Sequence, residues 1–158
     1  MTQYYIREIE FKAKSLADDR WVHGYYVKHE RPSIPIGDNP YKDRHYIAKT
    51  GFADWNLDRP IDMIEVDQKT VSQYTNFTDK NDTRIYDSDR VKLSDGKVYT
   101  VCWNEGGGYY DLAHEDDEEM IEDRILSHCI YHGLGDCELV GNIWDELDEL
   151  KESPTTNN

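Results

Sequence analysis

Residues 70–93 constrain the fold more than any other part of the chain. Two runs rich in β-branched and aromatic residues, 71–75 and 85–86 leading on to 90–93, flank a polar centre at 78–82. That centre consists of Thr, Asp, Lys and Asn, and Asp and Asn favour turns for stereochemical reasons. The order of strand-like run, turn cluster and strand-like run is typical of antiparallel strands. The segment therefore predicts a chain built largely from antiparallel β-structure.

Alternating patterns predict further strands. Residues 5–14 alternate apolar and charged side chains, and Ile9, Phe11 and Ala13 fall on one face. A period of two indicates a half-buried strand. Polar residues 15–20 are expected to turn the chain into a returning strand at 21–28. Other strands are expected at residues 46–48, 61–66, 90–93, 97–103, 109–113 and 138–143.

Two segments have helical spacing. Residues 115–131 begin with five consecutive acids, which suit the positive end of a helix dipole. Met120, Ile121, Ile125 and Cys129 then recur at the spacing of a helix face. A shorter amphipathic helix is predicted at Ile143, Leu147 and Leu150.

These elements predict a mainly β fold with minor α, in a domain spanning residues 4–150. Residues 4–69 would form an N-terminal β lobe, interrupted at 32–60 by an insertion rich in Pro and Gly. Residues 70–144 would form a small SH3-like barrel, because short strands follow one another with tight turns. One helix would be inserted before the last strand. Residues 151–158 are expected to be a disordered tail.

Composition limits the possible partners and compartments. The 158 residues include 33 acids and 18 bases, giving a formal net charge of −15. Such a surface repels nucleic acid, so direct nucleic-acid binding is not expected. Three cysteines do not form an even disulfide set, and no apolar run approaches membrane-spanning length. A cytoplasmic protein with reduced thiols and no membrane association is expected.

Three blocks of the chain carry a family resemblance. Residues 7–13 with 21–24, residues 70–93 and residues 138–144 occur in the order found in the YopX protein family. The chain resembles this family of small proteins, which are common in bacteriophages and prophages. The resemblance implies a phage or prophage product in the bacterial host cytoplasm, and it brings no established activity. Ser88 stands where the family usually has Gly.

An acidic run is the first candidate interaction site. It contains no Lys or Arg, and could imitate a phosphate backbone to occupy the basic groove of a DNA-binding protein. The alternative is a solvated helix start, because blocks of like charge are commonly just exposed. A calcium site is disfavoured, since ligands at alternating positions and a turn Gly are missing. The run consists of Asp111, Glu115, Asp116, Asp117, Glu118, Glu119, Glu122 and Asp123.

His128, His132 and Cys137 are weak metal-ligand candidates. The two histidines would share a helix face, but no Cys-x-x-Cys pair accompanies them and no metalloprotease Glu follows His128. A helix end with His near its C-terminus explains the pattern equally simply. We therefore expect no metal and no other cofactor.

No catalytic constellation is visible in the sequence. Cys102 lies in a strong strand pattern, where a small buried residue is the simpler interpretation. Gly106–Gly108 lack the Lys-Ser or Lys-Thr of a phosphate loop. Asp87 and Asp89 could serve acid–base chemistry, but turn solvation explains them.

Tyrosine doublets point to a binding surface. They occur at residues 4–5, 25–26 and 109–110, and in a strand one member of each pair faces the core and the other faces solvent. Surface tyrosines are favourable interface residues. The leading hypothesis is a non-enzymatic, self-associating module, expected to form a homo-oligomer, that binds a host or phage protein. The alternatives are an acidic DNA-mimic inhibitor of a host DNA-processing or defence protein, and a metal-dependent hydrolase.

Overall fold

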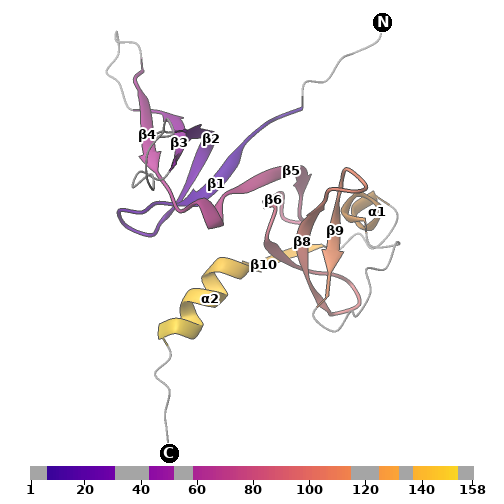
Figure 1. Ribbon diagram of the computed structural model, residues 1–158. Helices are drawn as coiled ribbons and strands as arrows, with labels where there is room; N and C mark the ends of the chain where they lie inside the picture. Colours follow the sequence, from indigo (N-terminus) through magenta and orange to yellow (C-terminus); the bar gives the residue numbers. More distant parts are fainter. Residues whose placement is uncertain (1–6, 31–42, 52–58, 115–124, 132–136, 153–158) are drawn as a thin grey trace, which may run out of the picture. The chain divides into compact units, whose positions relative to one another are not determined.

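The chain consists of two compact units joined through one strand (Figure 1). The computed structural model describes residues 7–30, 43–51, 59–114, 125–131 and 137–152. The units comprise Met1–Gln73 and Tyr74–Asn158, and strand β5 begins in the first and ends in the second. Strands are far more extensive than helices, which confirms the predicted mainly β fold.

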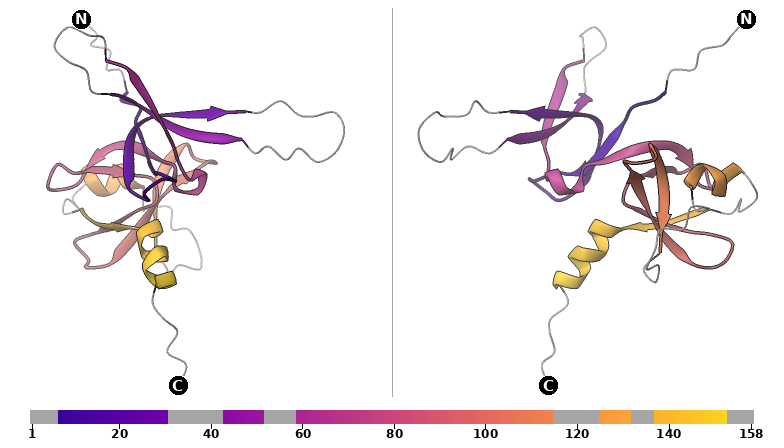
Figure 2. Two further views of the ribbon diagram at one scale, coloured as in Figure 1. Left: turned by 90° about the vertical axis from the view of Figure 1, so that its left-hand side faces the viewer. Right: turned by 45° about the vertical axis from the view of Figure 1, so that its right-hand side comes forward.

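The first unit is an antiparallel sheet with the strand order β4-β3-β2-β1-β5. Figure 2 shows β2 and β3 lying side by side, as their five-residue register requires. A short 3-10 helix, η1, precedes β5. The elements are β1 (Phe11–Lys14), β2 (Trp21–His29), β3 (Arg44–Thr50), β4 (Ile61–Glu65), η1 (Gln68–Thr70) and β5 (Ser72–Thr78).

A small apolar core lies on one face of this sheet. Ala13, Ile47 and Val66 are fully or almost fully buried, and Tyr26 and Ile64 pack against them. Ile47 pairs with Tyr26 on one side and with Ile64 on the other. Alternate residues of each strand therefore face the core, and the intervening residues face away from it.

In its described residues, the second unit contains the remaining strands and two helices. Its sheet has the order β10-β7-β8-β9, and β6 pairs with the end of β5. The elements are β6 (Arg84–Tyr86), β7 (Asp89–Lys92), β8 (Val98–Asn104), β9 (Tyr109–Ala113), α1 (Leu126–Tyr131), β10 (Glu138–Asn142) and α2 (Ile143–Glu152).

The second unit holds the larger of the two cores. Ile85, Val91, Val101 and Leu126 are completely buried, with Tyr99 and Leu112 packed among them. This cluster joins strands from both parts of the unit to helix α1. The closed barrel expected from the sequence stays a prediction, because the pairing described gives a four-stranded sheet.

The turn between β6 and β7 connects that sheet to helix α2. Asp89 is completely buried, and its carboxylate accepts hydrogen bonds from Tyr86 N at 2.8 Å and from Asn142 Nδ2 at 2.8 Å. The Asn142 side chain accepts in turn from Trp144 N at 2.9 Å, at the start of α2. Asp89 therefore has a structural role, fixing the turn against the end of β10.

The helix predicted over residues 115–131 is described only in part. Helix α1 covers Leu126–Tyr131, and Ile125 instead forms an isolated β-bridge with Asp111. The prediction was therefore wrong at Ile125, where backbone pairing replaces helix. Residues 115–124 lie outside the described part of the chain.

Three other boundaries differ from expectation. The first strand begins at Phe11, so residues 7–10 lie outside it although they alternate as predicted. The insertion expected to be loop-rich contains the seven-residue strand β3, which is longer than the predicted 46–48. Residues 151–152, expected in a disordered tail, complete helix α2, and residues 153–158 lie outside the description.

Candidate protein-binding face

Strands β2, β3 and β4 expose apolar side chains on the face opposite the core. Tyr25 is 67% exposed, Val27 38%, Ile61 73% and Met63 47%. Tyr46 and Ala48, on the middle strand, are half-buried between them. We call this surface the outer face, and define it as Tyr25, Val27, Tyr46, Ala48, Ile61 and Met63.

The strand register places these side chains next to one another. Tyr25 pairs with Ala48, and Ala48 pairs with Met63, so the three form a row across the strands. Val27 pairs with Tyr46 in the next row. Directly opposed side chains of antiparallel strands lie within contact distance. The outer face is therefore a continuous apolar surface.

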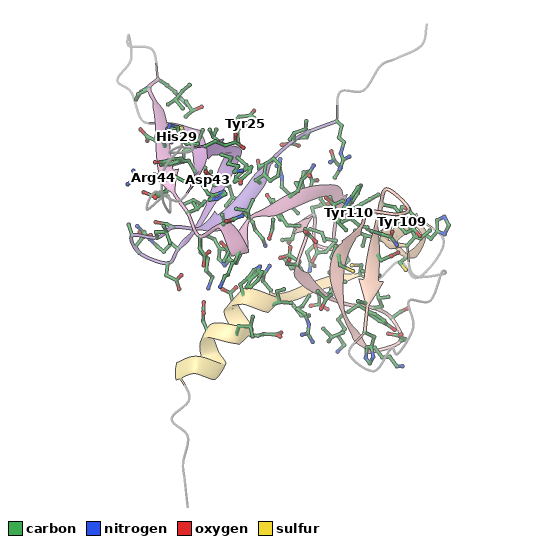
Figure 3. All side chains as sticks on the ribbon, viewed as in Figure 1. Tyr25, His29, Asp43, Arg44, Tyr109 and Tyr110 are labelled. Carbon is green, nitrogen blue, oxygen red and sulfur yellow. The ribbon has the colours of Figure 1, made fainter. Side chains whose placement is uncertain are left out.

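Charged residues border one end of the outer face. Arg44 Nε lies 3.5 Å from a Glu65 carboxylate oxygen on the side of the outer face, whereas Lys28 alternates with Tyr26 and has its Nζ 3.0 Å from an Asp43 carboxylate oxygen at the same end of the strands. Figure 3 labels Tyr25 together with His29, Asp43 and Arg44 from this region. Hydrogen bonds to Glu30 and then Asp43 raise the pKa of Lys28, so it stays charged at neutral pH. This border carries both signs of charge.

Buried contacts on the core side hold the outer face in position. Tyr26 stacks on His45 with ring centroids 5.9 Å apart, and its hydroxyl lies 2.5 Å from His45 Nδ1. His45 is buried, so the contact satisfies polar groups inside the unit. Because Tyr26 is anchored, its neighbour Tyr25 is held on the opposite side of the strand.

The tyrosine doublets behave as their alternation predicted. In β2, Tyr26 packs on the core and Tyr25 is exposed. In β9, Tyr110 is buried and Tyr109 is half-buried, and both are labelled in Figure 3. The doublet at residues 4–5 lies outside the described part of the chain.

Only one member of the predicted acidic surface lies in the described residues. Asp111 is buried, and its carboxylate accepts a 2.7 Å hydrogen bond from Asn104 Nδ2. It therefore contributes to packing between β8 and β9 rather than to an exposed acidic surface. The other members, Glu115, Asp116, Asp117, Glu118, Glu119, Glu122 and Asp123, lie outside the description.

The metal-ligand candidates do not form a described site. His128 is exposed on α1, whereas Cys137 is buried, and His132 lies outside the description. Over residues 7–30, 43–51, 59–114, 125–131 and 137–152, no three metal-ligating side chains come together. Burial, with Asp79 and Cys129 nearby, raises the pKa of Cys137 to about 11. Its thiol is therefore protonated at neutral pH, which disfavours metal binding.

Cys102 and Asp87 are half-buried, and Asp89 is completely buried. Burial raises the pKa of the Cys102 thiol, and Asp111 and Asp87 add to the effect. Burial likewise raises the pKa of Asp87, although Ser88 N and Trp103 N both donate to its carboxylate. A protonated thiol is a poor nucleophile. The Asp89 carboxylate accepts hydrogen bonds within the β6–β7 turn region described above.

Comparison with known proteins identifies the family. The family model described as YopX protein matches residues 10–151, which is most of the chain. The chain belongs to the YopX family. A search of curated proteins found no match to this YopX-family chain. In the described part of the chain, no helix is long and apolar enough to cross a lipid bilayer.

Sequence reasoning found one residue of the outer face and missed the others. The doublet at residues 25–26 identified Tyr25 as a surface tyrosine. The sequence predicts an apolar strand at residues 61–66. It does not predict that Ile61 and Met63 face solvent while Ile64 faces the core. The register against β3 decides this orientation, and it is a property of the folded sheet.

Proposed function

We propose that this YopX-family chain is a non-enzymatic, self-associating protein-binding module. In this proposal it is encoded by a phage or prophage and acts on a host or phage protein in the bacterial cytoplasm. The observation that carries the proposal is the outer face on strands β2, β3 and β4.

The composition and arrangement of the outer face support protein binding. Single exposed apolar residues are ordinary on protein surfaces, whereas contiguous groups of them often mark interaction sites. Tyr25, Tyr46 and Met63 belong to residue types enriched in interface cores. The Arg44–Glu65 contact supplies a charged border, as in the polar rim of many interfaces.

The state of the reactive side chains favours binding over catalysis. Raised pKa values keep Cys102 and Cys137 in the unreactive thiol form. The carboxylates of Asp79, Asp89 and Asp111 accept hydrogen bonds from neighbouring groups of the fold. Turnover that disappears when one Cys, His or acidic residue is replaced would contradict a non-enzymatic function.

Capture of partners from host lysate tests the outer face. The purified chain is compared with the Tyr25→Ser/Met63→Ser variant, which removes two neighbouring apolar contacts while leaving the core side intact. We expect at least a tenfold loss of the captured protein, because apolar anchors dominate interface energies. Leu16→Ser is the matched control, since Leu16 is 62% exposed but lies in the β1–β2 turn.

The outcome for the control variant decides the interpretation. Capture should survive Leu16→Ser, and circular dichroism should show that all variants keep their β-structure. Equal capture by the wild type and the double variant would exclude the outer face as the partner surface.

A second candidate function rests on the distribution of charge. The first unit has 11 bases and 12 acids, a net charge of −1, whereas the second has 7 bases and 21 acids, a net charge of −14. So strongly acidic a unit could present a phosphate-like surface to a basic DNA-processing or defence protein. Such binding would weaken steeply with salt and be competed by duplex DNA. Binding that ignores both would exclude the mimic.

A further inference from the structure

Strand β2 is paired unevenly along its two edges. Its first four residues, Trp21–Gly24, pair with β1, whereas its last five, Tyr25–His29, pair with β3. Within the described part of the chain, no strand pairs with residues 25–29 on the side where β1 lies. We call this stretch the open edge.

The open edge presents backbone hydrogen-bonding groups. Ser15 and Arg20 follow the pair of Lys14 with Trp21, and Ser15 N donates to Arg20 O at 2.9 Å. This bond identifies which residue pairs of β1 and β2 exchange backbone hydrogen bonds. Bonded pairs alternate along antiparallel strands, so Val22 and Gly24 direct their backbone groups toward β1. By the same alternation, Tyr26 and Lys28 direct theirs toward the open edge. An unpaired edge of this kind can accept another strand.

The residues that would extend β1 along this edge leave it instead. Residues 7–10 belong to no strand, and Figure 1 shows their trace leading away from the sheet before β1. Ile9 is consequently 54% exposed. A groove of about 490 Å³ lies beside the segment, lined by Arg7, Glu8, Ile9, Glu10, Gly24 and Tyr25.

The sequence of residues 7–10 nevertheless fits the open edge. The observed register pairs Phe11 with Gly24, and its continuation would pair Ile9 with Tyr26 and Glu8 with Val27. Ile9 would then lie on the same face as Phe11 and Tyr26, which contact the core. Glu8 and Glu10 would fall on the opposite, exposed face. The segment therefore has the alternation that a strand in this position requires.

We propose that residues 7–10 of one copy pair with the open edge of a second copy, and reciprocally. This inference rests on the self-association in the proposed function, and it names the surfaces involved. Each copy supplies one extended segment and one open edge, so a twofold arrangement satisfies both and closes on itself. Exchange of an identical element between copies is a low-cost route to a dimer. Pairing would bury Ile9 and satisfy the Tyr26 and Lys28 backbone groups.

Mixed cysteine cross-linking tests the exchange directly. A Glu8→Cys chain carrying a size tag is mixed with an untagged Val27→Cys chain, unfolded and refolded together, then oxidised. In the continued register these positions form a pair without backbone hydrogen bonds, about 4.5 Å apart at Cα, which is within disulfide range. We expect a disulfide-linked heterodimer that reduction separates. His23→Cys replaces Val27→Cys as the control, because His23 is on the same face of β2 but pairs with Lys12.

The unmodified chain supplies two further comparisons. Oxidation of the unmodified chain by itself measures how much cross-linking arises from the native Cys102, Cys129 and Cys137. Light scattering on it gives the oligomeric state. An oligomer that cross-links through Glu8→Cys and Val27→Cys supports the exchange. An oligomer without this cross-link overturns the exchange but leaves self-association standing. A monomer, including one in which a Glu8→Cys/Val27→Cys chain closes on itself, overturns both.

Discussion

Ser88 is held in a backbone conformation that serine rarely adopts. Its φ is +67°, in the left-handed region that favours glycine. Its backbone is nevertheless fixed, because Ser88 N donates to Val101 O at 2.8 Å and Ser88 O accepts from Ile143 N at 3.2 Å. The turn thus joins β8 to the start of α2, and the strain is maintained by these contacts. The preference for Gly here implied by the family resemblance has a direct stereochemical reason.

Ser88→Gly should therefore stabilise the chain. The substitution keeps both backbone hydrogen bonds and removes the left-handed penalty, so we expect about 1 kcal/mol of added stability toward unfolding. Chemical denaturation measures the change. Ser94→Gly is the matched control, since Ser94 is exposed in another turn and has no positive φ. A Ser88→Gly chain no more stable than wild type would show that the turn is not strained.

Two aspartates of the second unit should have pKa values shifted in opposite directions. Burial alone would raise the pKa of Asp79, but Leu139 N, Thr83 N and Asn81 N donate to its carboxylate and lower it below 3.8. Burial raises the pKa of Asp87 above 3.8. Asp79 therefore adds stability that is lost as pH falls through its lowered pKa. Asp87 adds stability below 3.8 that is lost as pH rises through its raised pKa.

Carboxyl carbon NMR titration should place the Asp79 midpoint below that of Asp87. Asp79→Asn should cost about 1–3 kcal/mol at neutral pH, because the acceptor for Leu139 N is lost. The cost should shrink in strong acid, where the wild-type carboxylate is also neutral. Asp82→Asn, an exposed change in the same loop, should have little effect. Equal midpoints would contradict the assigned hydrogen bonds.

At the scale of elements, strand β2 depends on a glycine at the point where its pairing changes. A Cβ on Gly24 would lie 2.3 Å from Ala48 O, and φ is +156°. A backbone oxygen cannot move away without breaking the β2–β3 register. Gly24→Ala should therefore destabilise the first unit by about 2–4 kcal/mol. Hydrogen exchange at Ile47 measures this. Gly106→Ala is the control, because only Asn104 Oδ1 comes near it, at 3.5 Å.

The sequence predicts elements well where a local pattern determines them. Strands β2, β8 and β9 and helix α2 lie close to where periodicity placed them. Ile125 was misplaced because helical spacing is a local signal, whereas its bridge to Asp111 is a tertiary contact. For a similar reason, the sequence did not predict that residues 7–10 lie outside β1. Which edge of β2 stays open depends on where β3 pairs, so neither the outer face nor the open edge is encoded in any single segment.

At the scale of the whole molecule, the net negative charge is concentrated in one unit. A net charge of −14 on Tyr74–Asn158 makes its folded state repel itself, whereas Met1–Gln73 carries only −1. The nearly neutral unit carries the outer face and the open edge. In the proposed exchange, contact between copies through the first unit would bring together surfaces with little net charge, and repulsion between the acidic units would oppose further association.

This division of charge predicts that salt acts on the two units unequally. Raising NaCl from 0.1 M to 1 M shortens the screening length from about 10 Å to about 3 Å, so repulsion within the second unit weakens. Hydrogen-exchange protection of Val101 in β8 should increase more than that of Ile47 in β3. Sucrose is the control, because it strengthens burial without screening charge and should protect both residues. Equal increases in the protection of Val101 and Ile47 in NaCl would mean that the acids of the second unit lie too far apart to repel one another strongly. The acidic unit would then have no concentrated field to present to a basic partner, which would also weaken the case for DNA mimicry.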